Sequence, residues 1–144
     1  AIDPGYGEPF WDSVEAVVAH AVFSIPGVRG VEFGDGFGAS RMKGSEHNDP
    51  IGEDGRPLRN GAGGVNGGIT NGAPVVFRVA FKPVATLLME QPTVTKGGEE
   101  TVLLARGRHD PCVVPRAVPV VEAMAALVLL DHCLLDRAAR GLFN

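Results

Sequence analysis

A block of twelve residues, 61–72, contains six of the 20 glycines in the chain. Glycine adopts backbone angles that other residues avoid, and it lets another backbone or a ligand approach closely. The block does not end in the Gly-Lys-Ser/Thr of a phosphate-binding P-loop. Two interpretations stay open: a flexible turn, or a backbone cradle for a flat or phosphorylated ligand.

The rest of the composition is typical of one globular domain. The chain has 144 residues, of which 44% are hydrophobic and 21% charged, and its net charge is -4. We therefore do not expect it to bind nucleic acid or a membrane surface. Its two cysteines are too few for a disulfide framework and no histidine pair has metal-ligand spacing, so we expect a cytoplasmic protein without a metal site. The longest apolar run, residues 117–130, is shorter than the roughly 18 residues that a membrane span requires.

The first half of the chain predicts one helix, one strand and one loop. Helical spacing of valine and alanine predicts a helix over residues 13–23, capped by Asp12 and stopped by Pro26. A short strand is predicted over residues 28–34. Residues 39–60 are polar and lack periodicity, so we expect a long, mobile surface loop there.

The second half predicts three strands and one long helix. The strands cover residues 74–81, 86–91 and 99–105, and the last two are expected to pair as a hairpin. The helix should have Pro119 in its first turn and Gly141 at its C-terminal cap, and its apolar character on nearly every side predicts burial on several faces. Because strands and helices do not alternate strictly, the predicted fold is α+β, a layered sandwich of helices and antiparallel sheet in one domain.

Several short motifs carry candidate chemistry, and each has a structural alternative. Residues 34–39 match the G-x-G-x-x-A dinucleotide pattern, but no helix pattern follows them, which disfavours that interpretation. Lys82 follows the strongest strand and could hold a phosphate or be a solvated turn residue. Arg-His-Asp-Pro at 108–111 offers a guanidinium, an imidazole and a carboxylate, yet it is equally compatible with an ordinary turn. Glu122, alone in the apolar run, needs a buried partner or a shifted pKa, and both a structural and a site-facing role stay open.

Four blocks of sequence occur in a distinctive order. The first is Ser-Ile-Pro-Gly-Val-Arg-Gly-Val-Glu-Phe-Gly-Asp-Gly-Phe at 24–37, and the second is Gly-Ser-Glu-His-Asn-Asp at 44–49 with the glycine-rich stretch at 60–72. The third is Lys-Pro-x-x-Thr at 82–86, and the fourth is Gly-Arg-His-Asp-Pro-Cys-Val-Val-Pro-Arg-Ala-Val-Pro-Val-Val-Glu-Ala-Met at 107–124. In this order they resemble the C-terminal part of the chorismate synthase family. One small departure is Arg59, where the family more often has a small hydroxyl residue.

The resemblance implies a lyase of the shikimate pathway, in aromatic amino acid biosynthesis. Such an enzyme eliminates phosphate and a ring proton from 5-enolpyruvylshikimate 3-phosphate to give chorismate. It uses reduced FMN, supplied by a flavin reductase or NADPH, although the overall reaction is redox-neutral. Asp110 would help to accept the proton, and Arg108 would neutralise flavin or substrate anions. The residues that the resemblance assigns to FMN binding are Pro26, Gly27, Gly67, Gly68, Lys82, Pro83, Val84, Ala85, Thr86 and Arg108.

The resemblance also implies that residues 1–144 are a single C-terminal segment of a longer enzyme. Members of the family are more than twice this length, form homotetramers, and carry their two acid-catalyst histidines in an N-terminal half. We therefore expect this chain to lack synthase activity by itself and to need that half as a partner. The alternative is a non-catalytic module that binds flavin or an anion.

Overall fold

The computed structural model describes residues 2–141 and begins with a short 3₁₀ helix, η1 (Phe10–Asp12), followed by helix α1 (Val14–Phe23). The cap of α1 is Ser13, whose hydroxyl accepts a hydrogen bond from the amide of Ala16 at 3.1 Å. The prediction of Asp12 as the cap is therefore wrong by one residue, because Asp12 closes η1 instead. The predicted helix itself is confirmed.

The valines of α1 form the centre of the hydrophobic core. Val14, Val18 and Val22 follow one another on successive turns and are at most 1% exposed. Burial of one valine side chain stabilises a fold by about 1.5 kcal/mol or more. The helical periodicity that predicted α1 is thus the same feature that anchors the core.

Strands β1 (Val28–Phe33) and β4 (Phe77–Phe81) form an antiparallel pair beneath the helices. Val28 lies opposite Phe81, and Phe33 lies opposite Phe77 with their rings stacked at 5.5 Å. Along β4, side chains of Phe77, Val79 and Phe81 are half-buried and pack against the core while the intervening residues are exposed, as the alternation of a strand requires.

The glycine-rich block folds into a small hairpin of β2 (Val65–Asn66) and β3 (Ile69–Thr70). The two-residue turn between them, Gly67 and Gly68, has φ of 58° and 91°, which is the left-handed region that such tight turns need. The expectation that this block uses backbone angles special to glycine is confirmed.

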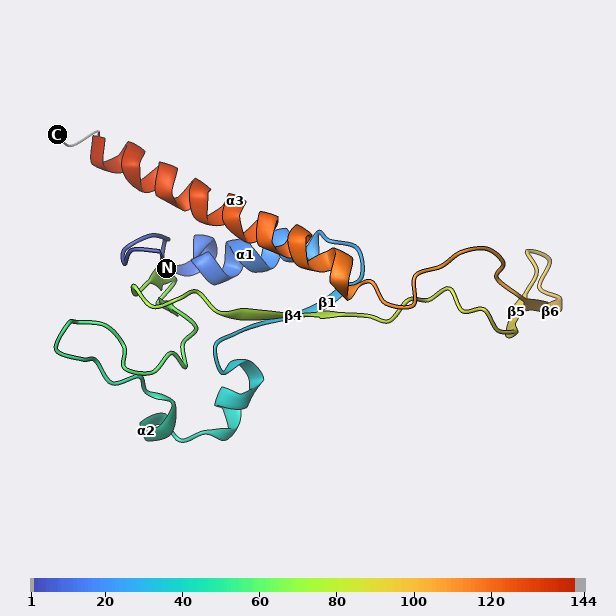
Figure 1. The fold of residues 1–144 in the computed structure, drawn as a ribbon, viewed down its shortest axis with the longest axis horizontal. Coiled ribbons are helices and arrows are strands. Elements are labelled where there is room, and N and C mark those ends of the chain that lie inside the picture. The colour runs from blue at the N-terminus through green and yellow to red at the C-terminus, as the bar shows by residue number, and fades with distance from the viewer. Residues whose placement is uncertain (1, 142–144) are drawn as a thin grey trace.

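A second hairpin pairs β5 (Gln91–Val94) with β6 (Glu100–Leu103) and projects away from the helices (Figure 1). The predicted hairpin is confirmed, but its first strand is not the expected 86–91. Pairing starts at Gln91 because the turn at residues 95–98 fixes which residues lie opposite β6.

Helix α3 (Val114–Gly141) runs along α1 (Figure 1). It starts five residues before Pro119, so the prediction that Pro119 lies in the first turn is wrong; Pro115 fills that role. Burial on several faces is also contradicted, because within residues 2–141 α3 packs on one side and Glu122 is exposed with no ion pair. The large side chains left exposed on α3 are Val114, Val118, Val120, Leu127, Leu130, Leu134 and Leu135.

By length and composition alone, α3 is apolar enough to cross a membrane, with a mean hydropathy of 1.9 over 18 residues. The apolar run of residues 117–130 identified in the sequence is shorter than α3, so it underestimated the length of this apolar helix. One side of α3 nevertheless packs on the core through Val121, Met124, Val128 and Leu129, which is how a core helix of a larger domain is used.

The polar segment after β1 is more ordered in secondary structure than expected. It contains a 3₁₀ helix, η2 (Gly36–Arg41), and one turn of α-helix, α2 (Gly44–His47). Neither contains a buried residue. Helices α1 and α3 lie over one face of the antiparallel β1–β4 pair, so the architecture is α+β, as the sequence predicts.

Candidate functional site

A pocket of about 370 Å³ lies where the C-terminal end of α1, the end of β4 and the start of α3 meet. Pro26 and Gly27 line one side, and the stretch from Lys82 to Ala85 lines the other. The two segments are joined directly, since the amide of Lys82 donates a hydrogen bond to the carbonyl of Gly27 at 2.8 Å. Six of the ten residues assigned to flavin binding therefore meet at one place: Pro26, Gly27, Lys82, Pro83, Val84 and Ala85.

The walls of this pocket combine apolar surface with two cations. Phe81, Val84 and Val113 supply apolar atoms, while Lys82 and Arg116 supply the positive charge. Lys82 is exposed and forms no ion pair within residues 2–141. An apolar slot with a few placed charges is the usual composition of a small-molecule site.

Asp110 does not line this pocket itself but forms an ion pair with Arg116, which does. The sequence analysis did not identify Arg116 as a site residue. The guanidinium of Arg116 lies 2.7 Å from the Asp110 carboxylate, and the Asp110 side chain is 34% exposed. Arg116 stands in the first turn of α3, six residues after Asp110, so only the position of the helix start brings the two together. Arg108 and Thr86 are exposed and do not line the pocket.

Gly67 and Gly68 lie away from the pocket, at the opposite end of α1. The carbonyl of Gly68 accepts a hydrogen bond from the first amide of the helix, Val14, at 3.0 Å. A side chain at Gly68 would place its Cβ 2.3 Å from the carbonyl oxygen of Glu8. Gly68 is thus required by the packing of the helix start, and the length of α1, about 15 Å, separates it from Pro26.

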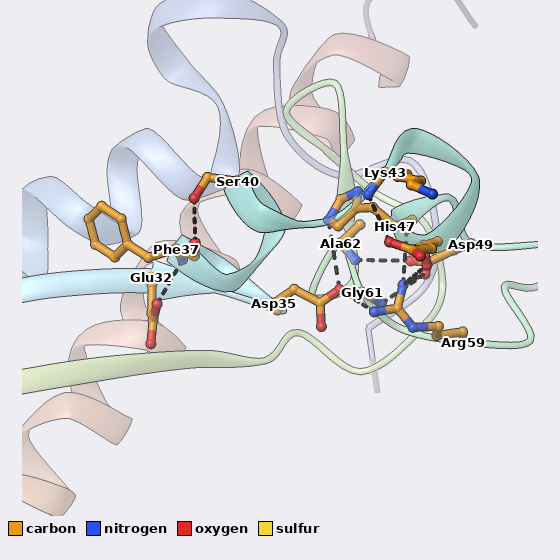
Figure 2. Close-up of polar contacts among 12 residues, drawn as sticks. Glu32, Asp35, Phe37, Ser40, Lys43, His47, Asp49, Arg59, Gly61 and Ala62 are labelled. Atoms are coloured by element: carbon orange, nitrogen blue, oxygen red, sulfur yellow. Dashed lines mark hydrogen bonds and ion pairs between the residues drawn. The ribbon is translucent and has the colours of Figure 1, made fainter.

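A second polar group, the Arg59 cluster, consists of Asp35, His47, Asp49 and Arg59 and lies beyond the other end of β1 (Figure 2). Arg59 forms ion pairs with both aspartates, through different nitrogens of its guanidinium. His47 Nε2 lies 3.8 Å from the Asp35 carboxylate. No periodic pattern in the sequence links these residues, and for that reason the cluster was not predicted.

The contacts of the Arg59 cluster are directed inward. Asp49 accepts hydrogen bonds from the backbone amides of Gly61 and Ala62, both at 2.9 Å. Nearby, Glu32 accepts from the amide of Phe37 at 3.0 Å and pairs with Arg78. Within residues 2–141, no group of three or more His, Cys, Asp or Glu is arranged to hold a metal ion. The cluster thus pairs its charges within the protein, whereas Lys82 at the pocket has no ionic partner in the described part of the chain.

A sequence profile for chorismate synthase matches residues 1–134. The chain belongs to the chorismate synthase family. It is 56% identical over 146 aligned residues to the chorismate synthase of Opitutus terrae, covering 99% of this chain and 40% of the relative. It is 57% identical over 137 residues to that of Methylacidiphilum infernorum, covering 93% of this chain and 37% of the relative.

The fold also matches a solved chorismate synthase structure, with a TM-score of 0.72 and 35% identity. The match covers 94% of this chain and 35% of the other. The chain thus spans about 40% of the length of the chorismate synthases that it matches. These comparisons confirm the predicted family and fold class.

Proposed function

We propose that this chain is the C-terminal portion of a chorismate synthase and contributes a flavin-binding face to that enzyme. The complete enzyme would eliminate phosphate from 5-enolpyruvylshikimate 3-phosphate in the cytoplasm, as a homotetramer. The observation that carries the proposal is the pocket, because Pro26 and Gly27 meet the stretch from Lys82 to Ala85 there although more than 50 residues separate them in sequence.

The residues of the pocket fit reduced FMN. A flat ring system needs apolar walls, which Phe81, Val84 and Val113 provide, and a phosphate needs a nearby cation without a partner, which Lys82 provides. The volume of about 370 Å³ is within the usual range of roughly 300–1,000 Å³ for ligand pockets. When bound, reduced flavin supplies electron density to the reaction, and it would be kept reduced by a flavin reductase or NADPH.

The charged residues beside the pocket divide into binding and proton-accepting groups. Lys82 would attract a phosphate or the flavin anion, and the exposed guanidinium of Arg108 would neutralise flavin or substrate anions from outside. Asp110 would accept the ring proton, with its carboxylate oriented by Arg116 at 2.7 Å. Arg116 would therefore act as a positioning residue for Asp110.

Catalysis would also need groups that this chain does not supply. The acid catalysts implied by the family resemblance are not among these residues, and several large apolar side chains of α3 are exposed, which suits contact with the rest of a longer enzyme. We therefore expect the chain to bind flavin without releasing phosphate from the substrate.

The test is an anaerobic titration of the chain with photoreduced FMN by calorimetry, combined with an assay for phosphate and chorismate. We expect saturable binding and no turnover. Lys82→Ala should weaken binding about tenfold, because a charge-assisted contact is lost. Lys96→Ala is the matched control, since Lys96 is exposed in the β5–β6 turn, outside the pocket.

Four results would count against the proposal. Absence of flavin binding would remove the pocket's assigned role. Equal affinities for the Lys82 and Lys96 variants would show that the phosphate is held elsewhere. Chorismate formed by the chain alone would contradict the expected dependence on the rest of the enzyme, whereas binding without turnover even after the other portion is added would favour the non-catalytic module.

A further inference from the structure

Residues 36–60 form an excursion that leaves the end of β1 and returns to the glycine-rich block. The excursion is closed at its base by a hydrogen bond from the amide of Asp35 to the carbonyl of Gly61, at 2.8 Å. Its helices η2 and α2 contain no buried residue, and Ile51 and Leu58 near its tip are exposed. Burial of apolar side chains therefore does not hold this segment in place.

Arg59 provides four of the polar contacts that hold it. Its Nη1 donates to the carbonyl oxygens of Glu46 and His47 at 3.2 and 3.0 Å, at the C-terminal end of α2. The same nitrogen lies 3.2 Å from the Asp49 carboxylate, and Nη2 pairs with Asp35 (Figure 2). One planar guanidinium thus joins the start, the middle and the end of the excursion, a geometry that the forked donors of arginine permit.

Asp49 transmits this anchoring to the glycine-rich block. Its side chain is only 7% exposed, and its two oxygens accept the amides of Gly61 and Ala62. A buried carboxylate needs both hydrogen bonds and a countercharge to remain in place. Arg59 is the cation that lies beside it.

We infer that Arg59 is a positioning residue, which pins residues 36–60 against the glycine-rich block and, through Asp49, fixes the backbone of Gly61 and Ala62. The pin is built from charge and hydrogen bonds alone. Its loss should therefore open the segment locally while the core around α1 stays folded.

The experiment compares the wild-type chain with Arg59→Ser, Arg59→Lys and Asp49→Asn. Trypsin cleavage after Arg41 and Lys43 reports opening of the segment, and hydrogen exchange of the Gly61 and Ala62 amides reports their position. Arg56→Ser is the matched control, because Arg56 is exposed in the same segment and forms no ion pair within residues 2–141.

We expect Arg59→Ser and Asp49→Asn to increase both rates about tenfold or more, since each removes one partner of an ion pair whose carboxylate is buried. Arg59→Lys should recover part of the protection, because lysine restores the charge but not the fork. The control should remain within twofold of wild type. Circular dichroism and the exchange of the Val18 amide verify that the core is intact.

Unchanged cleavage and exchange in Arg59→Ser would overturn the inference. So would an equal response of the Arg56 control, or full protection by lysine, because the geometry of the fork would then be irrelevant. None of these measurements uses flavin. A wild-type chain that fails to bind reduced FMN would therefore refute the proposed function and leave this inference standing.

Discussion

The two ends of the β1–β4 pair use charge in opposite ways. Beyond Phe33, the Arg59 cluster pairs its charges with one another and with backbone amides, and Asp49 is nearly buried. Beyond Val28, Lys82 has no ionic partner within residues 2–141 and lines an open pocket. More charged groups gather at the first end, but among residues 2–141 it is at the second end that a lysine without an ionic partner lines a pocket.

The glycines at the two ends differ in the same sense. Gly63, at the Arg59 end, is packed between the backbones of Gly34 and Val76, whereas Gly27, at the pocket end, faces the side chain of Phe81 at 3.7 Å. Of these two glycines, the one at the Arg59 end is therefore the one that another backbone approaches closely. Substitution of each glycine by alanine separates the two kinds of constraint.

The largest effect is expected for Gly63→Ala. A Cβ there would lie 2.5 Å from the amide nitrogen of Gly34 and 2.7 Å from the carbonyl oxygen of Val76, and φ is 71°. We expect the free energy of unfolding to fall by about 3 kcal/mol or more, since rigid backbone must move. Urea denaturation measures it. Gly55→Ala is the control, because Gly55 has a φ of 75° and nothing within 4 Å of its Cβ position.

A loss in Gly63→Ala no larger than that in Gly55→Ala would mean that only the backbone angle matters. The close approach at the Arg59 end would then carry no energy, and the proposed contrast between the ends would fail.

A smaller effect is expected for Gly27→Ala. Its φ of 93° strains an alanine, but the nearest atom, in the Phe81 ring, is at an ordinary contact distance. The cost should be about 1–2 kcal/mol, which is that of the left-handed backbone alone. Gly98→Ala, with a φ of 88° and open space around it, should cost the same by urea denaturation. If Gly27→Ala instead destabilises the protein as much as Gly63→Ala, Gly27 must be tightly packed, and the contrast between the two ends is wrong.

The sequence predicted the parts of the fold that depend on local periodicity. The apolar stripe that includes Val14, Val18 and Val22 predicted α1, because burial on one face repeats along a helix. The strand predicted over residues 74–81 contains β4 (Phe77–Phe81). The start of α3 was placed too late, since Pro115 and Pro119 both satisfy the rule for a first turn and only the fold decides between them.

The candidate site was predicted less evenly. Family resemblance selected Pro26 and Lys82, and the fold brings them together. The Arg59 cluster was missed because its members, 24 residues apart at the extremes, meet only when the excursion closes on itself. The predicted burial of α3 was too extensive. An apolar helix face favours burial, but its sequence does not show whether the same chain supplies the element that buries it.

The smallest effect is expected for Arg116→Ala at the pocket end. The Arg116 side chain is 73% exposed, so loss of its ion pair with Asp110 should change the free energy of unfolding by less than about 1 kcal/mol. Reduced FMN should nevertheless bind about threefold more weakly, because one cation leaves the pocket and the Asp110 carboxylate is left to repel the anion. Calorimetric titration measures this change.

The matched control for that effect is Arg140→Ala. Arg140 pairs with Asp136 at 2.8 Å and is 71% exposed, so it reproduces the ion pair of Arg116 at the other end of the same helix. The control should leave flavin affinity unchanged, and Arg116→Ala combined with Asp110→Asn should recover part of the lost affinity, because the repelling charge is gone. If both arginine variants bind flavin equally well, Arg116 does not contribute to flavin binding. Lys82 would then be the cation at the pocket end that attracts the ligand.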